Sequence, residues 1–313
     1  MSNRSIPRLL QTPAVVLLLI WMLVPLSMTL YFSFIRYVLN SLRKPEWTTP
    51  SLSNWRGLGN YEYVLFNAKD FWFAIQNSLF IVGSILVLTV ILGLAIAVLV
   101  NRSFPGRGIV RVLLISPFFV MPAVNAVLWI NMILDPVLGL QGIAVGGLNS
   151  IIDGLRDFPV LGAFFSLWPE IEPISFRATQ TSAYAVIMMV TWQWTPFAVL
   201  IFMTSLQSED ESQKEAATLD GANAWSQFRN LTVPHLARPI SIVVMIQSIF
   251  HLSLYAEIEI VSRGNGNKNL PYLIGEFSTN NIGAASATGI FAVILANIVA
   301  IFLLRMVGKS LMD

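Results

Sequence analysis

Residues 214–222 of the chain read Lys-Glu-Ala-Ala-Thr-Leu-Asp-Gly-Ala, and residues 231–234 read Leu-Thr-Val-Pro. This stretch is polar, carries charges of both signs and lies between two apolar runs. Its alanines and glutamate favour a helix, and Gly221 can turn the chain at a helix C-terminus. We therefore predict a short helix, a turn and a second helical stretch over 224–231, with Pro234 ending that stretch or opening the next apolar run.

The first helix of this segment is expected to begin near Ser208. Ser208 and Glu211 have the Ser-x-x-Glu spacing of a capping box, and the acidic residues 209–211 oppose the helix macrodipole. Small residues would let a partner's backbone approach closely; they are Ala216, Ala217, Gly221 and Ala222. A polar hairpin of this kind is typical of a docking surface for a soluble partner.

Composition identifies the chain as an integral membrane protein. Of its 313 residues 55% are hydrophobic and 12% charged, with a mean hydropathy of +0.69, whereas soluble domains carry about 25% charged residues. The net charge of +2 gives no reason to expect nucleic acid. The absence of cysteine excludes disulfides and thiolate chemistry, and two histidines leave little room for a histidine metal cluster.

Six apolar runs are long enough to cross a bilayer. We place the spans at 13–35, 73–100, 109–133, 180–206, 237–261 and 284–305. Backbone groups inside a bilayer must be satisfied within each span, so the fold class is all-α. The first run is interpreted as a retained signal-anchor helix. Four prolines inside spans predict kinks or unwound turns: Pro25, Pro117, Pro122 and Pro196.

Basic residues favour an orientation with both termini in the cytoplasm. The short loop 101–111 carries three arginines and no acidic residue, and short loops weigh most in the positive-inside rule. This orientation places 207–236 on the cytoplasmic side and 134–179 on the outer side. Within the outer segment, 136–140 and 148–155 are expected to form short interfacial helices.

The spacing of the loop resembles the EAA loop of ABC importer permeases, most closely those of binding-protein-dependent carbohydrate importers similar to the larger permease of the maltose importer. The matching loop residues are Glu215, Ala216, Ala217, Asp220, Gly221, Ala222, Phe228, Leu231, Val233 and Pro234. Trp192 to Phe197 also resemble the family's Trp-x-x-x-Pro-Phe pattern. The resemblance covers about 60–310.

This resemblance implies a type I importer permease with six transmembrane helices in a bacterial inner membrane. Residues 1–59 would form the N-terminal tail, first helix and outer loop, and residues 60–313 the permease core with its coupling loop at 207–236. The implied partners are a second permease, two cytoplasmic ATPases that hold ATP and Mg²⁺, and an extracytoplasmic solute-binding protein. Glu215 would pair with a basic residue of one ATPase, and the chain itself would not be an enzyme and would carry no cofactor.

Polar and aromatic residues inside the spans mark the expected solute pathway, because polar groups at membrane depth often face a cavity. Gln247, His251 and Tyr255 are spaced i, i+4, i+8 and would share one helix face. The full expected set is Asn125, Trp129, Gln193, Trp194, Phe197, Gln247, Ser248, His251 and Tyr255. Such groups suit a sugar-like solute, although an interfacial or lipid-facing position for Trp129 and a hydrogen bond from His251 to a neighbouring helix remain open. Glu257 and Glu259 are expected at the outer helix end, solvated or at a gate.

Two other function classes fit an all-α membrane protein. A stand-alone secondary transporter or channel for a small polar solute predicts acidic or basic residues in mid-span, or inverted repeats; the predicted spans lack such mid-membrane charges. A non-transporting scaffold explains an exposed hairpin but not the polar helix face.

Around 255–266 the chain departs from the family's usual Phe-Asp and Thr-Gly-Gly-Gly-Pro tract, which leaves the identity of the solute open.

Overall fold

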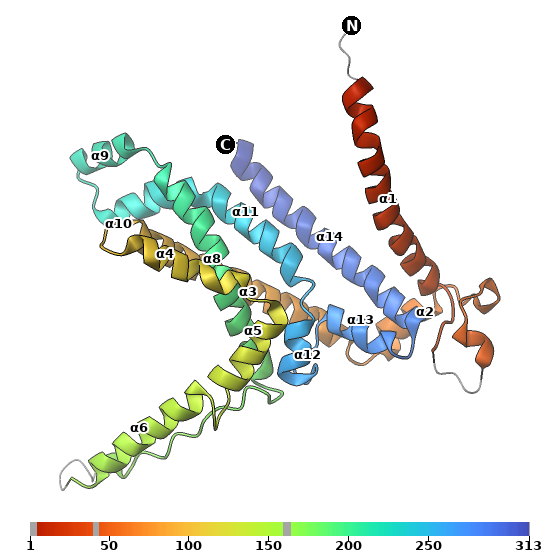
Figure 1. Ribbon diagram of the computed structural model, residues 1–313, viewed down its shortest axis with the longest axis horizontal. Coiled ribbons are helices and arrows are strands. Elements are labelled where there is room, and N and C mark those ends of the chain that lie inside the picture. The colour runs from red at the N-terminus through yellow and green to blue at the C-terminus, as the bar shows by residue number, and fades with distance from the viewer. Residues whose placement is uncertain (1–4, 40–43, 159–163, 313) are drawn as a thin grey trace. The chain divides into compact units, whose positions relative to one another are not determined.

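The computed structural model describes residues 5–39, 44–158 and 164–312. In these residues the secondary structure is helical, with two isolated β-bridges, Ile35–Trp55 and Val38–Asn281. The longer helices are α1 (Ser5–Ser33), α3 (Phe71–Asn101), α6 (Leu140–Arg156), α8 (Ser182–Gln207), α11 (Val233–His251) and α14 (Ile282–Met312). The shorter ones are α2 (Gly59–Glu62), α4 (Arg107–Ile115), α5 (Pro122–Leu128), α9 (Glu211–Leu219), α10 (Ala224–Gln227), α12 (Ala256–Ser262) and α13 (Leu270–Ser278). Figure 1 shows this order along the chain.

Five described helices are long and apolar enough to cross a membrane. They cover Leu10–Ser33, Phe71–Asn101, Ser182–Gln207, Ala224–His251 and Ile282–Arg305. These confirm the existence of five of the predicted spans. The sixth predicted span, 109–133, is broken where Pro117 and Pro122 predicted a kink or unwound turn: Arg107–Phe119 and Pro122–Ile133 meet at a bend of 103°.

Prolines explain where this span breaks. Pro117 lies in the first turn of the 3₁₀ helix η4 (Ser116–Phe119), and Pro122 opens α5. Proline lacks the N–H that a continuous helix needs but fits a first helical turn, where that N–H has no partner. Val120 and Met121 between the two helices are extended. Pro196, by contrast, lies within the uninterrupted α8.

The predicted span 237–261 also has different ends in the structure. Its helical segment begins earlier, at Ala224, and ends at His251. Residues 252–255 then separate it from α12. Residues 252–255 contain no proline or glycine, so the apolar pattern of the sequence does not reveal the break.

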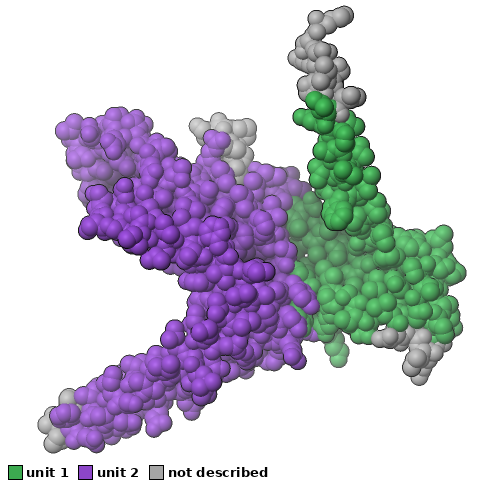
Figure 2. All heavy atoms as spheres, in the orientation of Figure 1, with its two compact units in different colours: residues 1–75, 270–297 green, residues 76–269, 298–313 purple. Residues whose placement is uncertain are grey.

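The chain forms two compact units, drawn in different colours in Figure 2. Unit 1 comprises residues 1–75 and 270–297, and unit 2 comprises residues 76–269 and 298–313. In unit 1 an apolar cluster of Val64, Phe71, Ala74, Leu270, Leu273, Ala284 and Ala287 forms the core. The expected division of the chain at 59/60 follows the family resemblance and stays a prediction.

Helix α8 is central to unit 2. In its most apolar 18-residue stretch 67% of the residues are buried, more than in any other described span. Its residues Ala198, Val199, Phe202 and Leu206 pack with Ala97 of α3 and with Leu236 and Val243 of α11. A glycine permits the approach of α3, since a Cβ at Gly93 would lie 2.7 Å from the Cβ of Ala198. The residues carried by α8 are therefore held in place by both neighbours.

In the described part of 134–179, helix α6 is longer than either of the two short helices expected there. Helix α6 includes 148–155 but starts at Leu140, so 136–140 is not a helix apart from its last residue. The returning chain is fastened to α6 by paired side-chain bonds: Asn149 donates to the carbonyl of Ile171 at 3.0 Å, and the N–H of Ile171 donates to Asn149 at 3.0 Å. Together these segments form an arm of unit 2 (Figure 2).

Candidate functional site: an exposed hairpin and a buried polar cluster

The predicted helix–turn–helix is present in the structure. Helix α9 is followed by Gly221 in the left-handed region at φ +83°, where a glycine is needed, and then by α10 and the π-helical turn η6 (Phe228–Thr232). Pro234 lies in the first turn of α11, so it opens that helix directly after η6. Asn223 caps α10 by accepting a hydrogen bond from the N–H of Ser226 at 2.8 Å.

The predicted capping box at the start of α9 is wrong. The N-cap is Asp210, whose carboxylate accepts a hydrogen bond from the N–H of Ser212 at 2.9 Å. Ser208 instead ends α8, and its hydroxyl donates to the carbonyl of Ser205 at 2.8 Å. Aspartate and serine are comparable N-caps, so the spacing of the motif could not decide between the two residues.

The hairpin presents most of its motif residues to solvent. Glu215, Ala216, Asp220, Gly221 and Pro234 are exposed, whereas Ala217, Ala222 and Phe228 are half-buried. Sequence reasoning missed two large apolar side chains at this surface. Leu219 is 88% exposed and Trp225 is 68% exposed. Large apolar groups exposed together with small residues are a feature of protein interaction sites.

A buried amide pair lies where α5 meets α8. The Asn125 amide donates to Gln193 Oε1 at 3.0 Å and to the carbonyl of Met189 at 3.2 Å. The Gln193 amide in turn donates to the carbonyl of Val120, in the extended link before α5. Both side chains are buried. The two predicted pathway residues are thus brought together, and they fix the broken span against α8.

Helix α11 contributes a second polar group to unit 2. Gln247, Ser248 and His251 are all buried. The Gln247 amide donates to the carbonyl of Trp194 at 3.4 Å, a long bond, and the Ser248 hydroxyl to the carbonyl of Met245 at 2.9 Å. Among the described residues, Gln247 Oε1 and both ring nitrogens of His251 have no hydrogen-bond partner.

Buried polar atoms normally find a hydrogen-bond partner. Gln247 Oε1 and the His251 imidazole therefore keep unsatisfied hydrogen-bonding capacity while both side chains are buried. Aromatic rings surround them: Trp194 contacts His251, Phe250, Phe197 and Phe118 with centroid distances of 5.0, 5.1, 6.0 and 5.4 Å. Apolar ring faces beside hydrogen-bonding groups can bind a polyhydroxylated molecule, which has C–H faces and hydroxyl edges.

Two residues of the predicted pathway, Tyr255 and Trp129, do not belong to the polar cluster on α8 and α11. Tyr255 follows the end of α11 and is 43% exposed. It therefore does not share a helix face with Gln247 and His251, and this part of the prediction is wrong. Trp129 packs edge to face on Trp192, with centroids 5.9 Å apart. The i+8 spacing assumed an unbroken helix, and that helix stops at His251.

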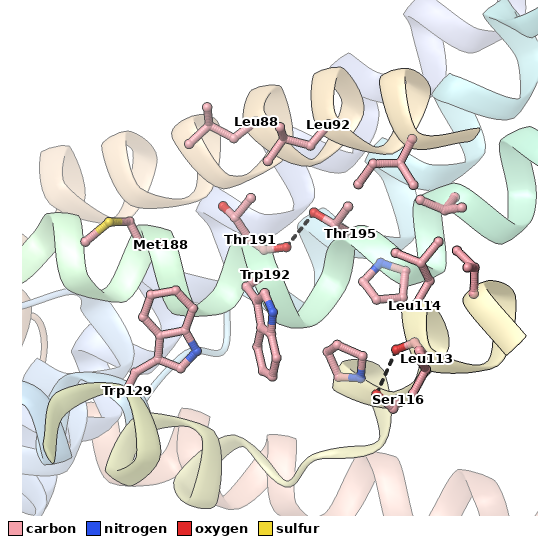
Figure 3. A pocket seen from close by; sticks show the side chains of 15 residues that line it. Leu88, Leu92, Leu113, Leu114, Ser116, Trp129, Met188, Thr191, Trp192 and Thr195 are labelled. Atoms are coloured by element: carbon pink, nitrogen blue, oxygen red, sulfur yellow. Dashed lines mark hydrogen bonds between the residues drawn. The ribbon is translucent and has the colours of Figure 1, made fainter. Parts of the chain in front are cut away.

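Trp129 lines a separate recess of about 690 Å³ between α3, α4, η5 (Trp129–Ile133) and α8. Figure 3 shows Leu88, Leu92, Leu113, Leu114 and Met188 pointing into it. The hydroxyls of Ser116 and Thr195 are bonded to backbone carbonyls, as the dashed lines show. Gln193, Gln247 and His251 do not line this recess. Its apolar wall suits a hydrocarbon neighbour, not a polar solute.

For Glu257 the expectation of a solvated side chain is wrong, whereas a role at a gate stays a prediction. Glu257 is 4% exposed, in the first turn of α12, and is not solvated. Burial raises the pKa of this carboxyl above its ordinary value of 4.5. The pKa of Asp135, which follows η5, is shifted the other way: hydrogen bonds from the N–H groups of Leu138 and Val137 lower it.

In the described residues no group of three or more His, Cys, Asp or Glu is placed to hold a metal ion.

The chain is similar to membrane components of known transport systems. It is 30% identical over 268 residues to the "Probable ABC transporter permease protein y4oQ" of Sinorhizobium fredii, covering 86% of this chain and 77% of that protein. It is 27% identical over 274 residues to the "Trehalose/maltose transport system permease protein MalF" of Thermococcus litoralis, covering 87% and 82%.

A solved structure shares the fold. A chain of a bacterial ABC transporter "involved in the import of the acidic polysaccharide alginate" superposes with a TM-score of 0.71 at 19% identity, covering 97% of this chain and 95% of that one. Residues 89–313 match the family described as "Binding-protein-dependent transport system inner membrane component". This matched region includes both the exposed hairpin and the buried polar cluster, and the chain therefore belongs to the family of inner membrane components of binding-protein-dependent transport systems.

Proposed function

We propose that the chain is the permease subunit of an ATP-driven importer that carries a sugar, sugar alcohol or sugar derivative into the cytoplasm. The observation that carries this proposal is the exposed hairpin at 211–227, which stands between two long apolar helices and presents Glu215 to solvent. The names of the relatives support the solute class, since one is a trehalose/maltose permease. A structural relative belongs to an alginate importer.

The hairpin would dock into one of two cytoplasmic ATPases. Glu215 would pair with a basic residue of that ATPase, while Ala217 and Gly221 would allow close approach. Leu219 and Trp225 would add apolar contact area, as their high exposure favours. ATP and Mg²⁺ would bind in the ATPases. Both termini and the hairpin would then lie in the cytoplasm, in agreement with the arginines of the loop 101–111.

The solute would pass by the polar cluster of unit 2. The unpaired atoms of Gln247 and His251 supply hydrogen-bonding groups, and Trp194 and Phe197 supply ring faces. A second permease would complete the pathway, and an extracytoplasmic binding protein would deliver the solute. ATP-driven closure of the ATPases would shift the permease between two conformations, because a ligand moves an equilibrium toward the state it binds more tightly.

The test is ATP-dependent uptake by the complete complex in proteoliposomes. The complex is made from this chain with a second permease, an ATPase and a binding protein from the same organism. Four labelled probes are offered: trehalose, mannitol, glucuronate and sn-glycerol 3-phosphate. Uptake of one probe that requires ATP and the binding protein is expected. Uptake by this chain alone, driven by an ion gradient, would overturn the proposal in favour of a secondary transporter.

A further inference from the structure

The side chain of Glu209, in the link between α8 and α9, is only 5% exposed although it is acidic. Its two oxygens contact different segments. Oε1 accepts a hydrogen bond from the hydroxyl of Thr232 at 2.9 Å, and Oε2 lies 2.8 Å from Nζ of Lys214. Lys214 belongs to α9, and Thr232 ends η6 directly before α11. One carboxylate therefore ties the first helix of the hairpin to the start of the next span.

Polar contacts, not apolar packing, hold this hairpin in position. No residue of α9 or α10 is buried, so neither helix has a core to anchor it. Within the hairpin, the Gln227 amide donates to the hydroxyl of Thr218 at 2.9 Å and to the carbonyl of Ala222 at 3.1 Å. These bonds join α9 to the segment that follows it but do not reach α11.

A second contact, between His235 Nε2 and the carbonyl of Ser205 at 2.9 Å, connects α11 to the end of α8 without involving α9. Glu209 is thus the residue whose side chain contacts both α9 and the threonine that precedes α11. The hydrogen bond from Thr232 to its carboxylate is charge-assisted, which makes it stronger than a neutral one, and the contact with Lys214 is an ion pair. Because the carboxylate is buried, salt screens its interactions less than those of an exposed pair.

We propose that Glu209 is a positioning residue for energy coupling: it makes α9 and the start of α11 move as one body. A displacement of the hairpin would then reach α11, the helix that carries Gln247 and His251. Without this tie, α9 could swing on the link between α8 and α9, and motion of a docked partner would be lost in that link. This inference rests on the proposed function, in which ATPases move the hairpin.

The chain contains no cysteine, so introduced cysteines can be labelled selectively. Gln213→Cys in α9 and Arg238→Cys in α11 replace exposed residues and would carry spin labels in a complex with cysteine-free partner subunits. Pulsed electron paramagnetic resonance then gives the distribution of distances between the labels, with and without ATP plus vanadate. The expected wild-type result is one narrow distribution in both conditions.

Glu209→Gln removes the ion pair while keeping the size of the side chain. It is expected to widen the distribution at least twofold and to reduce ATP-dependent uptake of the imported probe at least threefold. The double variant Glu209→Lys with Lys214→Glu restores opposite charges and is expected to recover part of both effects. Wild-type width, or wild-type uptake, in Glu209→Gln overturns the proposal.

The matched control is Glu211→Gln, an exposed acidic residue in the first turn of α9, which should leave the distribution narrow. If Glu209→Gln does not assemble, Lys214→Met removes the same ion pair from its more exposed side, 37% exposed. The distances are measured within one chain. A narrow wild-type distribution that widens in Glu209→Gln therefore supports the tie even if no probe is imported, a result that would count against the proposed function alone.

Discussion

The rings of Trp194 on α8 and His251 on α11 meet edge to face, with centroids 5.0 Å apart and planes inclined at 82°. The contact joins the two helices that also share the core around Phe202 and Val243. It leaves both nitrogens of His251 without a partner among the described residues. The ring is therefore fixed in orientation by packing, while its two nitrogens stay buried and unpaired.

His251→Leu should reduce ATP-dependent uptake while leaving assembly intact. The substitution keeps an apolar group beside Trp194 but removes the imidazole, and a lost hydrogen bond of about 1–1.5 kcal/mol corresponds to roughly a tenfold effect. Uptake is measured in proteoliposomes with the imported probe. The control is Ser241→Ala in the same helix, since the Ser241 hydroxyl donates only to the carbonyl of Ala237 in the preceding turn. Normal uptake in both variants would assign His251 a purely structural role.

Glu215→Ala should separate ATP hydrolysis from transport. The carboxylate is exposed in this chain, so its loss costs the isolated permease little stability, whereas truncating one partner of an interfacial charge pair typically costs about 2–5 kcal/mol. Uptake per ATP hydrolysed is expected to fall at least tenfold. Glu211→Ala, on the same helix and also exposed, provides the comparison. If uptake by Glu215→Ala equals that of the comparison variant, Glu215 does not dock.

Much of this fold could be predicted because its signals are local. The hairpin at 211–227 follows from alanines, a glycine and caps within a few residues, and only the choice of Ser208 over Asp210 as the N-cap was wrong. The long apolar helices follow from composition. The end of α11 at His251 could not be predicted, because no proline or glycine marks it and the break depends on tertiary contacts. One such contact is the bond from Asn269 to the carbonyl of Leu254 at 2.6 Å.

The sequence predicted which residues belong to the polar cluster but not how they are arranged. Polar side chains in apolar spans identified Asn125, Gln193, Gln247 and His251, yet no spacing rule pairs Asn125 with Gln193 across two helices. Tyr255 was misplaced because periodicity was extended past the helix end. Glu209 gave no sequence signal beyond its charge near a helix start. Its contact with Thr232 is long-range and becomes visible only in the folded chain.

Gly93→Leu should weaken the packing of α3 on α8. A Cβ at Gly93 would lie 2.7 Å from the Cβ of Ala198, closer than side-chain carbons normally approach. Overpacking of this kind typically costs about 1–3 kcal/mol. The thermal unfolding midpoint of the purified complex should therefore fall. Gly83→Leu in the same helix is the matched control, because nothing lies within 4 Å of a Cβ built there; equal midpoints would show that α3 can shift without cost.

Glu257→Gln should change how stability depends on pH. Burial raises the pKa of Glu257 in the folded chain above 4.5, so between 4.5 and the raised value the folded state binds more protons than the unfolded state. Stability contributed by the protonated group is therefore present below 4.5 and is lost as pH rises through the folded pKa. Glutamine cannot ionise, so the variant should unfold at a higher temperature than wild type at pH 8, with the difference shrinking toward pH 5. Glu259→Gln, two residues along the same helix and half-buried, serves as the control. A constant difference between Glu257→Gln and wild type across this range would mean that Glu257 keeps an ordinary pKa in the complex.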